Sequence, residues 1–501
     1  MERSERYRGS ALLTDFYQLT MAHGYWKTGT HHKEAVFHLF FRDAPFRSGY
    51  AIAAGLGDAI DWLRELRFTD DDLAYLASIT GNDGAPIFGR GFLDYLRDFT
   101  LTCDIDAVPE GTVVFPNEPL LRVRGPIIEG QLLETALLNC INFQTLIATK
   151  AARVCQSAQG DPVLEFGLRR AQGVDGALAA SRAAYIGGCA ATSNVLAGRI
   201  FGIPVKGTHA HSWVMSFDSE PEAFQAYAEA MPNNAVFLVD TYDTLEGVRR
   251  AAETGAWLRA HGHKLAGIRL DSGDLAYLSI EARKILDDAG FPDAKIFASN
   301  DLDEHIIASL KQQGAKISVW GVGTKLVTGY DQPALGGVYK LSAIRDRETS
   351  GGAWRHKIKL SEQAAKISNP GVQQIRRFTL KGEFIGDMIF NEEIRSGDVP
   401  AAPTSRIIID QTDIARRKSI PAAATHEDLL VPVFRAGRLV RENQPLEKIR
   451  ARAQDQLAHL HAGTKRLLNP HEYPVGLDPA LFDLRTRLIL ENRNINDTPA
   501  E

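Results

Sequence analysis

The sequence has few cysteines and no long apolar run. Only four cysteines occur among 501 residues, and none stands in a Cys-x-x-Cys pair. They are Cys103, Cys140, Cys155 and Cys189. This scatter argues against a disulfide framework or a structural zinc site, and it indicates a reduced, cytoplasmic setting. The N-terminus lacks the apolar run of a signal peptide, and the least polar stretch, residues 183–198, is too short and polar to cross a bilayer, so we expect no membrane partner.

An excess of basic residues is also missing. Lys+Arg number 57 and Asp+Glu 62, so the formal net charge at pH 7 is −5. A general nucleic-acid binder usually carries a basic excess, so we expect no nucleic-acid partner, although one basic pocket for a small anion is compatible with this balance. With 44% hydrophobic and 24% charged residues, the composition is that of a globular protein. The length predicts about three domains, or one large domain with appendages.

The middle of the chain repeats one pattern. Short apolar runs end abruptly in polar or glycine residues, and a helical pattern follows each run. The clearest runs end at residues 239, 270, 298 and 320, which are 31, 28 and 22 residues apart. Earlier runs lie at 163–164 and 203–205, with a weaker candidate at 185–190. This spacing is that of a strand plus a crossover helix, so it predicts βα units and a parallel sheet.

Six or seven such units predict an α/β fold in which residues 151–330 form an incomplete (β/α) barrel that carries the site. A doubly wound open sheet is the alternative, because spacing cannot prove closure. Residues 1–150 and 331–501 mix strands and helices, and we expect the C-terminal segment to fold back on the N-terminal one as a second α+β domain. Within the first of these, residues 127–155 are predicted to form one long helix.

Polar residues at the predicted strand ends are the candidates for chemistry, because ligands bind there in either architecture. Gly321-Val322-Gly323-Thr324 follows an apolar strand, and its backbone N–H groups and the helix behind it suit an anion. A plain βα turn is the commoner explanation of such a segment. Its place at the last strand of a barrel, where phosphate sites are frequent, favours function.

Four aspartates, Asp240, Asp243, Asp271 and Asp274, follow two neighbouring strands. Such a cluster suits Mg²⁺ bound through water, although Asp at these positions more often caps the following helix. Asp271 is the better functional candidate because Arg269 precedes it on the same strand face. Asp274 is better explained as a cap.

Two histidines, His209 and His211, follow another strand with i, i+2 spacing. A zinc pair would need a third ligand, and none stands out. A neutral histidine beside an anion-binding loop can instead attack a phosphoryl group. Tyr17, on a predicted N-terminal helix, would by default be a core residue.

Eight segments together resemble one known family. In chain order they are TDFYQLTMAHGYW, EFGLRRAQG, GTHAHSW, DTYDT, RLDSGDLAYLS, GVGTKLVT, KISNPGVQQIRRF and YPVGLDPALF. They look like segments of nicotinate phosphoribosyltransferase, a type II phosphoribosyltransferase. Each segment alone is weak, but eight in order across nearly the whole chain are highly specific.

The resemblance implies an enzyme of NAD biosynthesis that forms nicotinate mononucleotide and pyrophosphate from nicotinate and 5-phosphoribosyl 1-pyrophosphate. It implies ATP as a co-substrate, hydrolysed through a phosphohistidine, and Mg²⁺ as a cofactor. It further implies a partial barrel joined to a domain built from both chain ends, assembled as a homodimer.

The resemblance also assigns roles to individual residues of this sequence. The resemblance assigns nicotinate to Tyr17, Phe166, Thr208 and Arg269. Aromatic faces suit the pyridine ring, and the arginine can hold its carboxylate through two parallel hydrogen bonds. The phosphoribosyl pyrophosphate is assigned to Arg169, Gly321, Gly323 and Thr324.

Two residues match catalytic positions of the family. His211 matches the histidine that ATP phosphorylates, and Asp271 matches an acidic residue near the reacting ribose, where it would meet a metal only through water. His209 falls at a variable position and receives no role.

Three other functions are weighed against this one. A nicotinamide-using phosphoribosyltransferase shares the fold, but a neutral amide prefers an acidic or neutral partner, and GTHAHS offers no Asp or Glu. Quinolinate phosphoribosyltransferases are much shorter and use no ATP. A non-catalytic nucleotide-sensing barrel is disfavoured by the joint presence of His211, Arg269 and Asp271.

Overall fold

The computed structural model describes residues 9–346, 352–363, 366–393 and 406–494. The chain divides into two compact units, which are described separately below. One unit comprises Met1–Thr145 and Ala334–Glu501, and the other comprises Leu146–Pro333.

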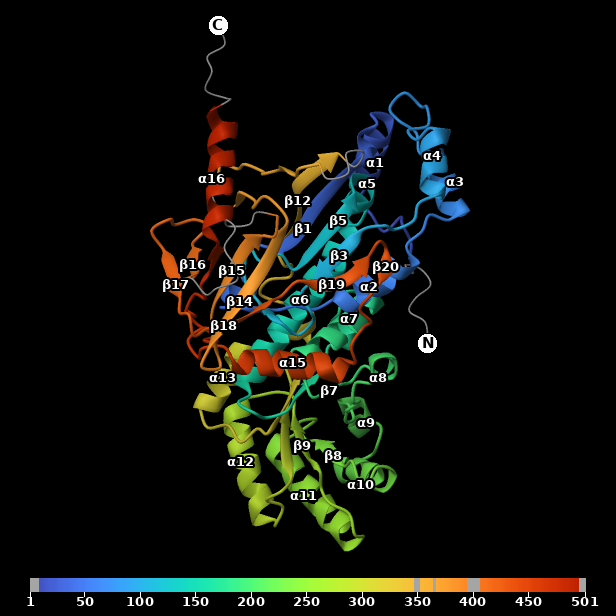
Figure 1. Cartoon of the computed structure of the whole chain (residues 1–501). Coiled ribbons are helices and arrows are strands. Elements are labelled where there is room, and N and C mark those ends of the chain that lie inside the picture. The colour runs from blue at the N-terminus through green and yellow to red at the C-terminus, as the bar shows by residue number, and fades with distance from the viewer. Residues whose placement is uncertain (1–8, 347–351, 364–365, 394–405, 495–501) are drawn as a thin grey trace. The chain divides into compact units, whose positions relative to one another are not determined.

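The unit of residues 146–333 is built on a six-stranded parallel sheet with the order β7-β6-β11-β10-β9-β8. Figure 1 labels β7, β8 and β9 of this sheet. Its strands are β6 (Val163–Glu165), β7 (Ala191–Thr192), β8 (Val236–Leu238), β9 (Gly267–Leu270), β10 (Lys295–Ala298) and β11 (Val319–Val322). The pairings between neighbouring strands are all parallel. The predicted α/β class and parallel sheet are therefore confirmed. In the described residues the sheet is open, with β7 and β8 at its edges.

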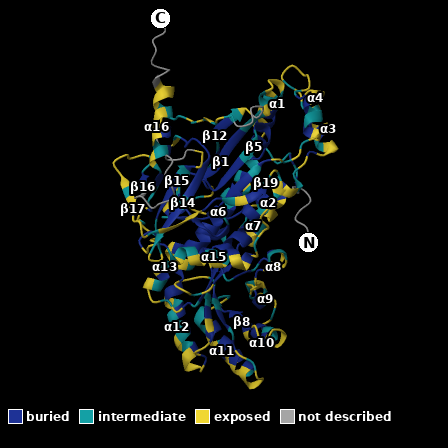
Figure 2. Ribbon diagram, in the orientation of Figure 1, coloured by how far each residue is buried: buried dark blue, intermediate teal, exposed yellow. Residues whose placement is uncertain are grey.

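Helices connect these strands as the repeat predicts. They are α7 (Gly173–Ile186), α8 (Val195–Phe201), α9 (His211–Met215), α10 (Glu220–Ala230), α11 (Thr244–Ala260), α12 (Leu275–Asp288), α13 (Glu304–Gln312) and α14 (Thr324–Val327), with a 3-10 turn, η3 (Leu168–Arg170). The Asp274 side chain accepts from the N–H groups of Ala276 and Tyr277, which confirms it as a cap, and Asp243 caps α11 in the same way. Figure 2 shows buried strands and exposed outer faces on α11 and α12.

Three element predictions are wrong, each for a local reason. The run at 185–190 covers the last two residues of α7 and the turn after it, and β7 begins only at Ala191, because a small-residue run suits a buried helix as well as a strand. Residues 203–205 form no strand; only Val205 bridges to Thr192. The helix predicted over 127–155 is two helices, α5 (Ile127–Leu132) and α6 (Glu134–Ser157), separated at Leu133.

The other unit contains two larger sheets. The first has the order β13-β12-β1-β5-β3-β19-β20, formed by Arg355–His356, Gly337–Asp346, Lys33–Phe41, Leu121–Pro126, Asp104–Ala107, Val431–Arg435 and Arg438–Leu439. The second has the order β17-β16-β21-β15-β14-β18, formed by Arg417–Ile420, Arg406–Ile409, Val475–Leu477, Glu383–Asn391, Gln373–Leu380 and Thr425–Asp428. Because β1 pairs with β12 and β3 with β19, segments from both ends of the chain share one sheet.

Helices and a small ribbon complete this unit. Besides α5, the helices are α1 (Phe16–Lys27), α2 (Leu56–Glu65), α3 (Asp70–Ser78), α4 (Arg90–Arg97), α15 (Leu446–Ala458) and α16 (Pro479–Asn494), with 3-10 turns η1 (Thr30–His32) and η2 (Pro45–Arg47). The ribbon joins β2 (Ala51–Ile52) to β4 (Val113–Val114).

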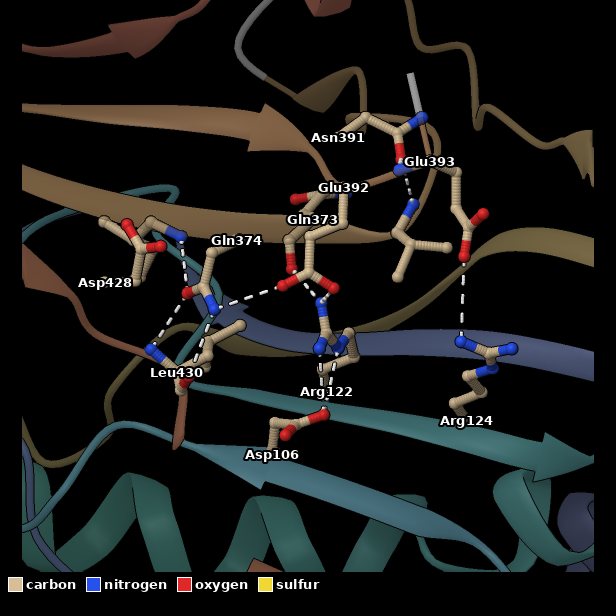
Figure 3. Close-up of polar contacts among 12 residues, drawn as sticks. Asp106, Arg122, Arg124, Gln373, Gln374, Asn391, Glu392, Glu393, Asp428 and Leu430 are labelled. Atoms are coloured by element: carbon tan, nitrogen blue, oxygen red, sulfur yellow. Dashed lines mark hydrogen bonds and ion pairs between the residues drawn. The ribbon is translucent and has the colours of Figure 1, made fainter. Parts of the chain in front are cut away.

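A buried arginine ties the two larger sheets together (Figure 3). Arg122 on β5 donates to Asp106 on β3 at 2.9 Å and to Glu392, just after β15, at 2.8 Å. It also donates to the backbone carbonyl of Gln373 on β14 at 2.9 Å. Because each buried charge is paired and hydrogen-bonded, the cluster is explained by its role in holding the sheets together.

Candidate active site

Arg269 lies at the centre of a polar cluster at the carboxyl ends of the parallel strands. It is on β9, and its guanidinium makes three hydrogen bonds. Nε donates to Ser299 Oγ at 2.8 Å, Nη1 to Thr208 Oγ1 at 3.1 Å, and Nη2 to Asp271 Oδ1 at 2.9 Å. These partners hold the arginine fork in one orientation while its side chain keeps 17% exposure. An incoming anion therefore meets a positioned cation.

Asp271 divides its two oxygens between two neighbours. Oδ1 accepts from Arg269 and also from the Ser299 hydroxyl. Oδ2 lies 3.8 Å from Nε2 of His211. The carboxylate therefore connects the arginine with the histidine, so a change at one of them can be felt at the other.

His211 is the first residue of α9, and its side chain is 41% exposed. Its Nδ1 lies 3.1 Å from Thr241 Oγ1, directly after β8, while Nε2 faces Asp271. The ring is thus oriented from both sides yet remains accessible. Such a histidine can accept a group from a bound substrate.

Asp240 holds the loop after β9. Its Oδ2 accepts from the backbone N–H of Asp271 at 3.0 Å and from the Ser272 hydroxyl at 2.5 Å. Its Oδ1 is buried and has no hydrogen-bond partner among the described residues. Asp240 and Thr241 are consecutive, so one short loop sets the separation of Asp271 and His211.

Phe166 packs beside Arg269 and against two glycines. Its ring centroid is 6.0 Å from the guanidinium carbon of Arg269. A Cβ on Gly321 would stand 2.8 Å from the Phe166 ring, and a Cβ on Gly323 would stand 2.9 Å from the Phe166 carbonyl oxygen. The close approach of the loop after β6 therefore explains why both positions are glycine, whether or not they also bind phosphate.

A buried carboxylate supports that loop. Glu165 accepts from the hydroxyls of Ser181 and Thr192 at 2.8 and 2.6 Å, and from the backbone N–H of Gly167. Since Gly167 follows Phe166 directly, these bonds fix where the aromatic ring stands.

Arg169 and Thr324 lie in neighbouring elements. Arg169 is exposed on η3, and Thr324 begins α14, which contacts η3. The helix that begins at Thr324, α14, has only four residues, so its dipole contributes less to anion binding than the sequence predicts. An anion there would depend on backbone N–H groups, the hydroxyl and the arginine.

Tyr17 belongs to the other unit. It is 47% exposed on α1, so the default expectation of a core residue is wrong. The next residue, Gln18, is buried and donates to the backbone carbonyl of Gln131 at 2.6 Å, which anchors the helix. Burial, followed by the charge of Glu134, raises the pKa of Tyr17 to about 12, so its hydroxyl stays protonated.

The described residues contain no group of three or more His, Cys, Asp or Glu side chains able to hold a metal. Asp243 and Asp274 are used as caps, and Asp271 is paired with Arg269. Mg²⁺ that arrives on substrate phosphates needs only one or two protein carboxylates. The unpartnered Oδ1 of Asp240 meets that requirement. The described residues therefore suit Mg²⁺ bound together with substrate, and they do not form a metal site made of protein ligands alone.

The predicted residues of this unit fall into two groups. Contacts join Phe166, Gly321, Gly323, Thr208, Arg269, Asp271 and His211, while Arg169 and Thr324 lie in adjoining segments. Ser299, Thr241 and Glu165 also belong to this arrangement, although no role for them was predicted from the sequence. All three stand at ends of predicted strands, which was the available signal. An α/β enzyme with its active site at the carboxyl ends of a parallel sheet is the class that this arrangement defines.

Comparison with known proteins gives the family. Models described as nicotinate phosphoribosyltransferase match in three parts: the N-terminal domain at residues 12–142, the family model at 162–377 and the C-terminal domain at 373–485. The Bacillus subtilis nicotinate phosphoribosyltransferase is 46% identical over 493 residues, covering 96% of this chain and 95% of the relative. The chain belongs to the nicotinate phosphoribosyltransferase family.

Solved structures agree with this assignment. The crystal structure of human nicotinic acid phosphoribosyltransferase matches with a TM-score of 0.80 and 33% identity, over 95% of this chain and 99% of that one. A nicotinate-nucleotide pyrophosphorylase from Pyrococcus furiosus, at 20% identity, shares the fold with a TM-score of 0.68.

Among the described residues, no helix has the length and apolar character needed to span a membrane.

Proposed function

We propose that this enzyme transfers the phosphoribosyl group of 5-phosphoribosyl 1-pyrophosphate to nicotinate, as a step of NAD biosynthesis. One observation carries the proposal. Arg269, held by three hydrogen bonds, stands beside the Phe166 ring at 6.0 Å and shares a bond with Thr208. A fixed cation beside an aromatic face is what a flat pyridine carboxylate requires.

In the reaction, the C1–O bond to pyrophosphate breaks while the pyridine nitrogen forms a bond to the same carbon. The pyrophosphate leaves with the electron pair, and positive charge develops on the ribose. Arg269 would hold the carboxylate, Thr208 would line the pocket, and Phe166 would stack on the ring. Tyr17 is assigned to the ring by the family resemblance alone. These residues contribute orientation, which is the main requirement of such a transfer.

The phosphate end of the substrate is assigned to Arg169, Gly321, Gly323 and Thr324. The adjacency of η3 and α14 supports this assignment. Mg²⁺ would be held by the substrate phosphates and the free oxygen of Asp240, with Asp271 acting through water. When bound, the ion neutralises charge on the pyrophosphate.

ATP enters through His211. Its imidazole would attack the γ-phosphorus of ATP, so that an N–P bond forms, the bond to the bridging oxygen breaks, and ADP leaves. Water later cleaves the N–P bond and releases phosphate. The contact of Asp271 with both Arg269 and His211 supports a link between nicotinate binding and this cycle.

The strand order also supports an incomplete barrel. Read around a circle, β6, β7, β8, β9, β10 and β11 are neighbours in chain order, with one gap between β7 and β8.

A homodimer is supported by α1, where Phe16, Tyr17 and Met21 are 46%, 47% and 38% exposed. A cytoplasmic setting is supported by the four cysteines, because no disulfide joins them in the described residues.

Product analysis tests the proposed function. The protein is incubated with 5-phosphoribosyl 1-pyrophosphate, Mg²⁺ and either nicotinate or nicotinamide, with and without ATP. We expect nicotinate mononucleotide, with more product per unit time and net ADP formation when ATP is present. Preferred conversion of nicotinamide supports the alternative nicotinamide enzyme, and no turnover with either base supports a sensing barrel.

Replacing Thr324 by alanine is expected to raise KM for 5-phosphoribosyl 1-pyrophosphate by roughly fivefold to tenfold, because one hydroxyl donor to phosphate is lost. The KM for nicotinate should stay within about twofold of wild type. Steady-state kinetics with each substrate varied in turn measures both constants. A rise confined to the nicotinate KM would place Thr324 in the other half of the site.

Replacing Thr241 by valine is expected to slow phosphorylation of His211 by about tenfold, because the ring loses the hydroxyl that orients Nδ1. Serine at this position keeps the hydroxyl and should restore most of the rate. Rapid-quench measurement of acid-labile phosphate after addition of labelled ATP gives the rates. Equal rates for the valine and serine variants would show that the hydroxyl at position 241 does not assist phosphorylation of His211.

A further inference from the structure

His209 occupies the gap between the two edge strands of the parallel sheet. The segment that contains it starts beside β7, where the N–H of Thr192 donates to the Pro204 carbonyl and the N–H of Lys206 donates to the Thr192 carbonyl, each at 3.0 Å. Its other end reaches β8, where Nε2 of His209 accepts from the backbone N–H of Leu238 at 3.2 Å. The segment therefore contacts both edges of the open sheet.

The Leu238 N–H has no acceptor on a neighbouring strand. Val239 donates to the Arg269 carbonyl at 3.2 Å, so the alternation along β8 directs the Leu238 N–H away from β9. Among the described residues no strand pairs with that edge of β8. A buried N–H without an acceptor is destabilising, and the imidazole provides that acceptor.

The surroundings of the ring keep it neutral and fixed. His209 is 8% exposed and lies edge-on to the Tyr227 ring, with centroids 4.8 Å apart. Its Nδ1 is 3.3 Å from the Ala210 carbonyl, which accepts the ring proton while Nε2 accepts from Leu238. Burial lowers the pKa of His209, and the positive charge of Arg269 acts in the same direction.

We infer that His209 is a positioning residue whose imidazole replaces the missing strand neighbour of β8 and thereby holds the loop that carries Thr208 and His211. The residue before it bonds Arg269 through Thr208 Oγ1 at 3.1 Å. The residue two positions after it bonds Thr241 through His211 Nδ1 at 3.1 Å. Both contacts lie one or two residues from the His209 anchor, so release of the anchor displaces both. The inference rests on the proposed function for the roles of these two neighbours.

Two amide variants form a matched pair for the test. In His209→Gln the amide oxygen reaches the place of Nε2 and can accept from Leu238. In His209→Asn the same amide is one methylene shorter and does not reach it. His209→Leu, of similar volume and without an acceptor, completes the set. Circular dichroism and thermal unfolding of each variant establish that it folds.

We expect the glutamine variant to keep kcat/KM for nicotinate within about threefold of wild type. The asparagine and leucine variants should lose about tenfold or more, with a raised KM for nicotinate and slower labelling by ATP. In hydrogen exchange followed by mass spectrometry, a peptide containing residues 236–240 should lose the protection of one amide in the asparagine and leucine variants only.

Equal kinetics for the glutamine and asparagine variants, or unchanged exchange in that peptide, would overturn the inference. The exchange experiment needs no substrate, so it tests the His209 anchor even if the wild-type enzyme does not use nicotinate. Failure of the proposed function would show separately, as an absence of nicotinate mononucleotide in the wild-type reaction.

Discussion

Replacing Arg269 by alanine is expected to lower kcat/KM for nicotinate by roughly one and a half to four decades. Removal of one partner from a buried charged contact typically costs about 2–5 kcal/mol, and each 1.36 kcal/mol is a factor of ten. The variant also leaves Asp271 and Thr208 without their arginine partner. Steady-state kinetics with nicotinate varied at saturating co-substrates gives the value.

Arg269→Lys separates the effect of the positive charge from that of the planar guanidinium. Lysine keeps the charge but not the planar fork, so it should recover only part of the loss. Arg249→Ala is a suitable control, because this arginine is exposed on α11 and its side chain pairs with Glu246 of the same helix. An unchanged kcat/KM in Arg269→Ala, or a wild-type preference for nicotinamide, would contradict the assignment.

Replacing His211 by alanine is expected to abolish both ATP hydrolysis and the stimulation of the reaction by ATP. A slow ATP-independent transfer should remain at high substrate concentration, because the bond changes at the ribose need no phosphohistidine. A phosphate on His211 adds negative charge beside Asp271 and can reorganise the loops through new charge-assisted hydrogen bonds. Loss of the histidine therefore removes the coupling and leaves the transfer.

Labelling with γ-labelled ATP measures this directly. Wild-type protein should carry label that is acid-labile and base-stable, and His211→Ala should carry none. His261→Ala is a matched control, since this exposed histidine follows α11 and its Nδ1 contacts the Trp257 carbonyl in the preceding turn of the helix. Equal acid-labile labelling of wild type and His211→Ala would contradict the assignment, and the neighbouring His209 would be tested next.

Much of the parallel sheet was predictable because its signals are local. A buried strand appears as a short apolar run, and the chain turns polar where the strand ends, as at Leu270 followed by Asp271. The exceptions are places where local sequence is ambiguous. The small residues before Ile186 suit a buried helix as well as a strand. Pro204 lacks an N–H, so residues 203–205 give only a bridge instead of a ladder.

The sequence predicted which residues belong to the candidate site more fully than it predicted the contacts between them. Arg269, Asp271 and His211 were named from strand ends and from the family resemblance. Ser299 and Thr241 were missed because hydroxyl residues at strand ends are common, and nothing local distinguishes these two. Their importance follows from which strand lies beside β9, since Ser299 comes from one neighbour, β10, and Thr241 from the other, β8.

The sequence by itself determined the βα repeat, the residue types at the strand ends and the family, because these depend on short-range patterns and on matching segments. Only the tertiary structure decided that the two oxygens of Asp271 serve different partners, that Phe166 requires the glycines at 321 and 323, and that His209 bonds the edge of β8. The physical reason is that the contacts of Asp271 with His211, of Phe166 with the two glycines and of His209 with Leu238 join residues distant in the chain. Such contacts are set by the lateral order of strands and by the unpaired N–H groups at sheet edges, and neither is encoded in any single segment.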